Sequence, residues 1–430
     1  MNGRRRVNRR HRFVFGSLVT LLSLLPACKS PSPHPKPAAT RDGRWRQDVE
    51  YLCDNLTRLH KDFFRYSSRE GFEAARRRLL ARIPELSDAQ IMVELAALGA
   101  WPGDAHTGVV ITADKRLLRV PLATNEFSDG WFIVAAPEGH EDWLGAKLVA
   151  IDDHSMDEVL QRLARIISHE NMYWVRYRLP RYVRLPEVLH AVGVARRPDS
   201  FRLRVRLADG ASREIEMRGV ARDELPQFVT YHDAHPIDDL PPSRKNRDQN
   251  YWYEVLPGTK TVYFAHNRCV ENPEKPFAPL AREVLDLIDD GKVDRLIFDL
   301  RYNGGGGEVV AWPLLRHLAE RESINRRGGI FCLIGPHTFS SAKANAISLK
   351  KWTHAITVGR PIGNKPNSFG EVRTFRLPNS ELLVRYSTKY FRRWDTDVDS
   401  LYPDIEAPDT FADWAAGRDR ALEIARDWSE

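Results

Sequence analysis

The sequence feature that most constrains the fold is a regular alternation of apolar strand-like runs and helix-like segments after residue 250. Strands are predicted at 261–266, 296–300, 330–334 and 355–358, and helices at 280–288, 309–318 and 341–351. Such alternation is typical of a central sheet whose faces are covered by helices. The pattern therefore predicts an α/β fold for this part of the chain.

Two of these strands end in residues that are suited to chemistry. The strand at 296–300 runs into four glycines at 304–307, and the strand at 330–334 delivers Ser340 and Ser341 to the start of a helix. Glycine permits the positive φ that aims backbone N–H groups into a site. Acyl transfer needs such N–H groups together with a serine at a strand-to-helix junction. The pattern favours a serine hydrolase, with helix capping by the two serines as the alternative.

The first 28 residues are typical of an export signal. Six arginines precede an apolar run at 13–25 that is too short for a comfortable membrane span, and Leu25-Pro26-Ala27-Cys28 resembles a bacterial lipoprotein signal. Removing the segment lowers the formal charge from +7 to +1, so charge gives no case for a nucleic-acid partner. We expect an exported protein, periplasmic or at the cell surface, that is anchored to a bacterial membrane through a lipid on Cys28; simple secretion is the alternative.

The remaining chain divides by composition. After the signal at 1–28, we expect a proline-rich tether at 29–42 and a helical N-terminal region at 43–114, then a β-rich domain at 115–220 that resembles a PDZ module, a polar linker at 221–250 and a catalytic domain at 251–430. A generic small β-rich domain is the alternative at 115–220. The widely spaced Cys53, Cys269 and Cys332 predict buried thiols rather than a disulfide framework or a metal site.

The residues around both strand ends resemble the carboxyl-terminal processing, or tail-specific, serine peptidases and the related tricorn core. The likeness lies in Asp-Leu-Arg at 299–301, Asn-Gly-Gly at 303–305, Thr338 with Ser-Ser-Ala at 340–342, Val-Gly at 358–359, Pro-Asp-Ile at 403–405 and, for the tricorn-like branch, Gly-Asp-Ala-His-Thr at 103–107. This resemblance implies a crotonase-like α/β catalytic domain. It also implies that extended or unfolded polypeptides are the substrates.

The resemblance places the nucleophile at Ser340, with Ser341 as the close rival. It offers two general bases, His106 from one branch of the family and Lys365 from the other, and places the acid that would orient a histidine at Asp397. The oxyanion hole is expected from backbone N–H groups of Gly304, Gly305 or Gly306 and from that of Ser341. Asp299, Arg301 and Asn303 are expected to support the glycine turn by hydrogen bonds. Lys343 and Arg360 depart from the family, which usually has acids at both positions.

The sequence therefore favours an exported serine-type endopeptidase that works through an acyl-enzyme and acts on a polypeptide substrate. The departures at Lys343 and Arg360 leave its activity open. No cluster of metal ligands is visible in the sequence, so neither a metal nor a cofactor is implied. The rival hypothesis is a non-catalytic protein on the same fold that binds an apolar ligand or a peptide tail. The sequence leaves the oligomeric state open.

Overall fold

The computed structural model describes residues 30–429, so the expected signal segment and Cys28 lie outside the described residues. Within the described part of the chain, no helix is long and apolar enough to cross a membrane.

A six-stranded sheet forms the centre of the C-terminal half. Its order is β16-β13-β12-β11-β10-β9, with β9 antiparallel to β10 and all other neighbours parallel. The strands are β9 (Tyr251–Val255), β10 (Thr261–His266), β11 (Arg295–Asp299), β12 (Ile330–Ile334), β13 (Ile356–Gly359) and β16 (Ile405–Glu406). The inner strands β10, β12 and β13 are buried along their whole length, as expected for parallel strands that are covered on both faces.

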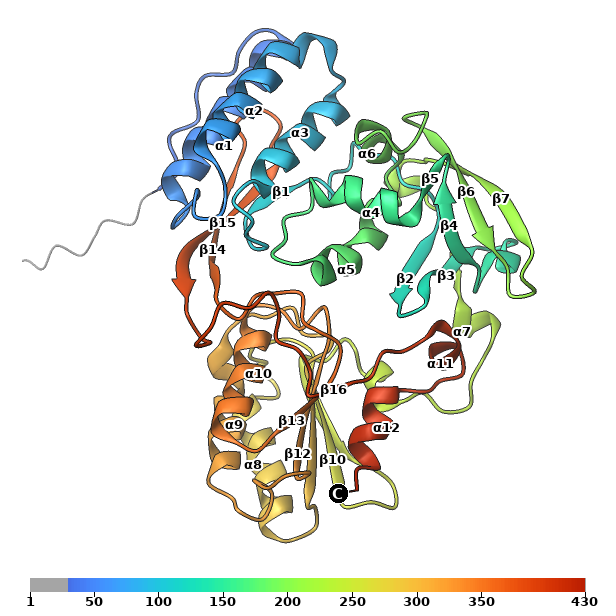
Figure 1. Cartoon of the computed structure of the whole chain (residues 1–430), viewed down its shortest axis with the longest axis vertical. Coiled ribbons are helices and arrows are strands. Elements are labelled where there is room, and N and C mark those ends of the chain that lie inside the picture. The colour runs from blue at the N-terminus through green and yellow to red at the C-terminus, as the bar shows by residue number, and fades with distance from the viewer. Residues whose placement is uncertain (1–29, 430) are drawn as a thin grey trace, which may run out of the picture.

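Helices cover both faces of this sheet (Figure 1). On one face lie α8 (Phe277–Asp289), α9 (Trp312–Ala319) and α10 (Ser341–Trp352), and on the other lies α12 (Arg420–Arg426). Separate apolar clusters fill the two interfaces. The predicted α/β architecture of a helix-covered sheet is confirmed, and the strands predicted at 261–266 and 330–334 have the observed bounds.

The N-terminal helices are α1 (Arg41–Leu59), α2 (Arg69–Arg82) and α3 (Asp88–Ala100). Ser68 caps α2, and Ser87 with Gln90 forms a reciprocal capping box at the start of α3. Beside these helices lies a hairpin from far along the chain, β14 (Ser368–Arg376) and β15 (Leu383–Phe391) (Figure 1).

This hairpin crosses from the six-stranded sheet to the N-terminal region. β15 pairs antiparallel with β1 (Gly108–Val110), so that Val109 lies opposite Val384. The turn of the hairpin is held by α1, because the fully buried carboxylate of Asp48 accepts the backbone N–H groups of Asn379 at 2.9 Å and of Ser380 at 2.8 Å. The two halves of the chain are therefore joined by a shared three-stranded sheet.

A third, antiparallel sheet lies between these parts in the sequence. It contains β2 (Ala123–Phe127), β3 (Gly130–Pro137), β4 (Lys147–Ile151), β5 (His154–Ser155), β6 (Ser200–Arg206), β7 (Ser212–Arg218) and β8 (Phe228–Thr230). The helices α4 (Met156–Ala164), α5 (Met172–Tyr182) and α6 (Pro186–Ala191) interrupt it. β6 and β7 pair antiparallel as a hairpin, with Asp209-Gly210 in its turn. A PDZ-like character for this region and the domain boundaries given above stay predictions.

The short helices α7 (Tyr231–Ala234) and α11 (Phe411–Ala415) complete the described helices, apart from several single turns of 3₁₀ helix. The segment expected to be a linker at 221–250 contains β8 and α7, so it is more structured than its polar composition indicated.

Candidate active site

The glycine turn after β11 is built around the side chain of Asn303. Its Oδ1 accepts the N–H of Gly305 at 2.9 Å, its Nδ2 donates to the carbonyl of His266 at 2.8 Å, and its own carbonyl accepts the N–H of Phe339 at 3.0 Å. The side chain is fully buried. The turn is therefore fixed to the end of β10 and to the segment that carries the serines.

A buried network of ion pairs and hydrogen bonds at the end of β11 supports the same turn. Arg301 donates to Asp299 at 2.7 Å and to both carboxylate oxygens of Asp419, at 2.7 Å and 2.8 Å, while Tyr263 donates to Asp299 at 2.8 Å. These contacts agree with the supporting role expected for Asp299, Arg301 and Asn303. Arg301 is thereby tied to the start of α12.

Two of the four glycines cannot carry a side chain. Gly305 has φ +104, and a Cβ there would lie 2.7 Å from the Cβ of Ser340 and 3.1 Å from the backbone nitrogen of Ser341. Gly306 has φ +134, and its Cβ would lie 2.2 Å from the carbonyl oxygen of Cys269. L-residues rarely adopt such φ values. The glycines let the turn approach the start of α10 closely.

Ser340 occupies a strained strand-to-helix turn. Its φ is 55° and its ψ is −119°, in the left-handed half of the map that residues other than glycine avoid. Its side chain makes no capping hydrogen bond to α10. The capping alternative therefore does not describe Ser340. Strain of this kind, at a sharp turn that exposes a hydroxyl, is a recurring feature of nucleophilic serines.

Ser341 is used differently. Its Oγ donates to the carbonyl of Gly306 at 2.5 Å, which fastens the glycine turn to the first residue of α10. Within residues 30–429, the backbone N–H groups of Ser341 and Gly306 donate to no acceptor, whereas that of Gly305 is taken by Asn303. Of the N–H groups expected to form an oxyanion hole, those of Gly304, Gly306 and Ser341 have no acceptor among the described residues, and that of Gly305 is taken.

The strained backbone of Ser340 is held by a relay of side chains. Its N–H donates to Oδ1 of the buried Asn364 at 3.0 Å, and Nδ2 of Asn364 donates to the carboxylate of Glu170. The same carboxylate accepts the N–H of Lys365 at 2.7 Å. Glu170, from the segment before α5, thus holds the loop that holds the serine, and no signal in the single sequence identifies it.

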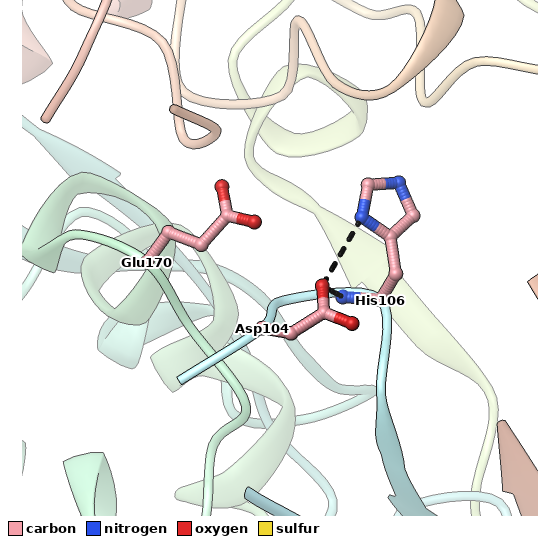
Figure 2. A group of neighbouring side chains, drawn as sticks. All are labelled: Asp104, His106 and Glu170. Atoms are coloured by element: carbon pink, nitrogen blue, oxygen red, sulfur yellow. Dashed lines mark hydrogen bonds and ion pairs between the residues drawn. The ribbon is translucent and has the colours of Figure 1, made fainter. Parts of the chain in front are cut away.

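His106 lies beside the serine segment, with its ring 4.5 Å from the ring of Phe339. Its Nδ1 lies 3.6 Å from Oδ1 of Asp104, and neither ring nitrogen has a hydrogen-bond partner within the described residues. Figure 2 shows Nδ1 on the side of the Asp104 and Glu170 carboxylates and the other ring nitrogen, Nε2, pointing away from both. This orientation suits a ring that carries its proton on Nδ1 and keeps Nε2 free to accept one.

Asp104 is fully buried and has several partners. It accepts the backbone N–H of His106 at 2.9 Å, the hydroxyls of Thr107 and Ser387 at 2.6 Å each, and is paired with His60 at 3.2 Å. Burial alone would raise the pKa of Asp104, but the interactions with His106, His60 and Ser387 outweigh burial and lower the pKa. Asp104 is therefore a carboxylate that faces His106. The sequence motif contained it, but the acid was sought elsewhere.

Asp104, His106 and Glu170 each offer one atom that could bind a metal ion, and these atoms lie within 4.8 Å of one another (Figure 2). The sequence did not predict this group, because Glu170 is far along the chain. Burial and the nearby Asp104 raise the pKa of Glu170. Two carboxylates and an imidazole suit a divalent cation. The same three side chains also suit a catalytic arrangement in which a carboxylate orients the imidazole. Both oxygens of Asp104 already accept hydrogen bonds from the protein.

Two of the expected catalytic residues are not brought to His106 or Ser340. The Lys365 ammonium lies over the ring of Tyr66, 5.4 Å from its centroid. Asp397 is exposed, and its Oδ1 accepts a hydrogen bond from Asn367 at 2.7 Å. In this structure the acids beside His106 are Asp104 and Glu170 rather than Asp397, and the loop at 364–365 contributes backbone groups rather than a lysine side chain.

The unexpected basic residues have defined partners. Arg360 pairs with Glu126 of β2 at 2.9 Å. Lys343 is buried, and its Nζ donates to the carbonyl of Lys365 at 3.0 Å and to Oγ of Ser368 at 2.5 Å. Burial outweighs the attraction of Glu170 and lowers the pKa of Lys343 to about 8. Lys343 and Glu170 therefore both bind the backbone of the loop at 364–365.

Ser340, Ser341, Gly304, Gly306, His106 and Lys343 all line one cavity of about 990 Å³. Residues of β1, α5, β14 and β15 complete its wall. The N-terminal helices, the middle region and the six-stranded sheet thus each contribute to one site. A hydroxyl, an imidazole and backbone N–H groups that have no acceptor within residues 30–429 meet there. Such a set can attack a carbonyl carbon and stabilise the resulting oxyanion.

No protein-family model and no curated protein matches the chain. Among solved structures, mature CPAF in complex with lactacystin has a TM-score of 0.61 at 14% identity, covering 90% of this chain and 98% of that chain. A mutant of CPAF gives 0.59 at 14% identity, covering 90% and 97%. Tricorn protease is similar at a TM-score of 0.41 and 14% identity, covering 90% and 36%. The chain therefore has the fold of CPAF, a member of the C-terminal processing peptidase family, and the fold that the sequence resemblance implied is confirmed.

We predict that Gly305→Ala lowers the free energy of unfolding by about 1–3 kcal/mol, because the new Cβ is strained at φ +104 and collides with Ser340. Gly307→Ala is the matched control in the same turn. Gly307 has φ −92, and its Cβ would meet no atom closer than 3.8 Å. Urea unfolding of both variants is the measurement, and an equal loss in the two would contradict the proposed close approach.

Stability should depend on pH through Lys343. Its pKa is about 8 in the folded chain and 10.5 ordinarily, so between these values the unfolded chain binds more protons. The free energy of unfolding should therefore rise as pH increases from about 8 to 10.5, by up to about 3 kcal/mol. Lys343→Met should lose this rise, whereas the exposed Lys260→Met should keep it. Urea unfolding at several pH values measures the difference. The same dependence of the free energy of unfolding on pH in all three proteins would contradict the prediction.

Proposed function

We propose that the chain is a serine-type peptidase of the carboxyl-terminal processing kind. The observation that carries the proposal is the geometry at Ser340: its hydroxyl caps nothing, its backbone is strained, and it shares a cavity with His106 and with backbone N–H groups that have no acceptor among the described residues. The likeness to CPAF supports the fold on which this site is built.

In the proposed mechanism, the Oγ of Ser340 attacks the carbonyl carbon of a peptide bond while Nε2 of His106 takes its proton. Asp104 holds Nδ1–H on its own side of the ring and stabilises the imidazolium that forms. The N–H groups of Ser341 and Gly306 stabilise the oxyanion of the tetrahedral intermediate. His106 then gives its proton to the leaving amine, and a water molecule, activated by the same ring, releases the acyl group from Ser340.

The substrate is a polypeptide in an extended form. The cavity is bordered by β14 and β15, and charged side chains of several elements line it, among them Arg178, Arg181, Lys343 and Arg393. A purely apolar ligand would take water away from Arg178 and Arg181, which have no carboxylate partner within residues 30–429, and this is costly. The lining therefore favours a peptide with its own polar groups over the apolar-ligand function that the sequence left open.

Substitutions of Ser340, Ser341, His106 and Lys365 should distinguish the roles of these residues. Fluorophosphonate labelling should disappear in Ser340→Ala and persist in Ser341→Ala, whose Oγ is already donated to Gly306. His106→Ala should slow labelling about 10²–10⁴-fold, the usual contribution of a general base. Lys365→Met should label like the wild type. The proposal fails if the folded wild-type protein takes no label, or if the loss follows Ser341.

We further propose that the protein is exported and held at a bacterial membrane by a lipid on Cys28, a position supported by the sequence at 1–28 alone. Expressed with its own signal in a bacterial host, the wild-type protein should partition into the detergent phase of a Triton X-114 extract. Cys28→Ser should move to the aqueous phase. Cys53→Ser, which changes a buried thiol, should partition like the wild type. Equal partitioning of Cys28→Ser and wild type would rule out the anchor.

A further inference from the structure

One helix brings a set of arginines to the catalytic cavity. α5 packs on the serine segment through Trp174, whose ring stacks on Phe339 at 4.2 Å. Arg178 and Arg181 follow at four and seven residues after Trp174, so all three lie on one face of the helix. Arg178 and Arg181 both line the cavity that contains Ser340. The helix that supports the nucleophile therefore also carries charge to its side.

A second cavity of about 510 Å³ continues this basic wall. It shares Arg181, His337 and Thr112 with the first cavity, and Arg184, just beyond the end of α5, lines it. The two cavities therefore adjoin where Arg181 and His337 lie. The arginines are spread along the path from one cavity to the other rather than gathered at one point.

These arginines have no carboxylate partner within residues 30–429. Arg178 lies over the ring of Trp174 at 5.5 Å and Arg181 over that of Tyr177 at 5.6 Å, and Nε of Arg184 is buried without an acceptor. The nearby acids are already engaged: Glu308 with Arg393, Glu371 with Lys389, Glu126 with Arg176 and Arg360, and Asp409 with the N–H of Arg420.

The surroundings of these side chains are electrically positive. Burial lowers the pKa of Arg178, and the neighbouring Arg181 lowers it further. Burial and Arg119 do the same for Arg184. Burial, with Arg181, Arg247 and Arg178, also lowers the pKa of His337 to about 4, so His337 is neutral at the junction. A half-buried guanidinium without a counter-ion is costly, and an incoming anion would relieve that cost.

We propose that Arg178, Arg181 and Arg184 bind acidic side chains of the polypeptide substrate on one side of the scissile bond. The inference rests on the proposed peptidase function and adds a substrate class to it. A single C-terminal carboxylate could not serve all three arginines, because they are divided between two adjoining cavities. An extended segment with several Asp or Glu residues could, since guanidinium groups bind carboxylates in bidentate pairs.

The test uses quenched fluorescent peptides of one length, with amidated C-termini, that carry Glu, Gln or Lys at the positions flanking a common cleavage site. We expect kcat/KM for the Glu peptide to exceed that for the Gln peptide at least tenfold, mainly through KM, and the Lys peptide to be the poorest. The preference should shrink as NaCl is raised, because the contacts are ionic. A second set of the same peptides with free C-termini is compared, and a preference for Glu that appears only in that second set would overturn the proposal.

Variants assign the effect to the helix. Arg181→Gln, at an exposed position that should tolerate the change, should reduce the preference for Glu over Gln about tenfold, through a higher KM for the Glu peptide. Arg178→Lys and Arg184→Gln should each weaken it. Arg204→Gln, an exposed arginine of β6, is the matched control and should retain the full preference. An undiminished preference in Arg181→Gln and Arg184→Gln would refute the assignment.

The inference can fail independently of the peptidase proposal. Fluorescence anisotropy with Ser340→Ala measures binding of a labelled Glu peptide without any cleavage, and binding should be at least tenfold tighter than for the Gln peptide. If the wild type labels with fluorophosphonate but shows no acidic preference, the substrate inference alone is lost. If Ser340→Ala prefers the Glu peptide but the wild type takes no label, the binding site stands and the catalytic proposal is lost.

Discussion

The buried carboxylate of Asp104 is the interaction on which the candidate site depends. It joins three segments that are distant in the sequence: His60 after α1, the turn that carries His106 and Thr107, and Ser387 of β15. Removing one partner of a buried charged pair leaves the other charge unpaired, which lowers the free energy of unfolding by about 3–5 kcal/mol. The position of His106 is therefore a property of the assembled chain, because no single segment could hold it.

The serine is positioned by an equally indirect route. The strained backbone of Ser340 lies against Gly305 and donates a hydrogen bond to Asn364. Asn364 in turn donates a hydrogen bond to Glu170. Lys343 binds the same loop from the side of α10. The basic residue that departs from the family pattern thus has a structural explanation, because Lys343 and Glu170 both bind the backbone of the loop at 364–365.

The sequence predicted the helix-covered sheet and the support of the glycine turn well, because both depend on local patterns. Strands such as 330–334 are continuous apolar runs, and glycine at 305 and 306 reflects a local φ requirement. The pairing of β15 with β1 could not be predicted, because register between strands so far apart leaves no periodic signal in one sequence. The same limit applies to Glu170. Lys365 and Asp397 were assigned catalytic roles from their distance along the chain to other motifs. That distance does not determine the direction of a side chain.

The hairpin of β14 and β15 bears on how the protein is made. Since β15 supplies both the partner strand of β1 and the Ser387 hydroxyl on Asp104, the imidazole cannot be fixed in place until almost the whole polypeptide has left the ribosome. Contacts between such distant segments also form late in folding. If the proposed mechanism holds, a nascent or truncated chain would carry Ser340 without an oriented His106, and would cleave neither itself nor its neighbours until synthesis is complete.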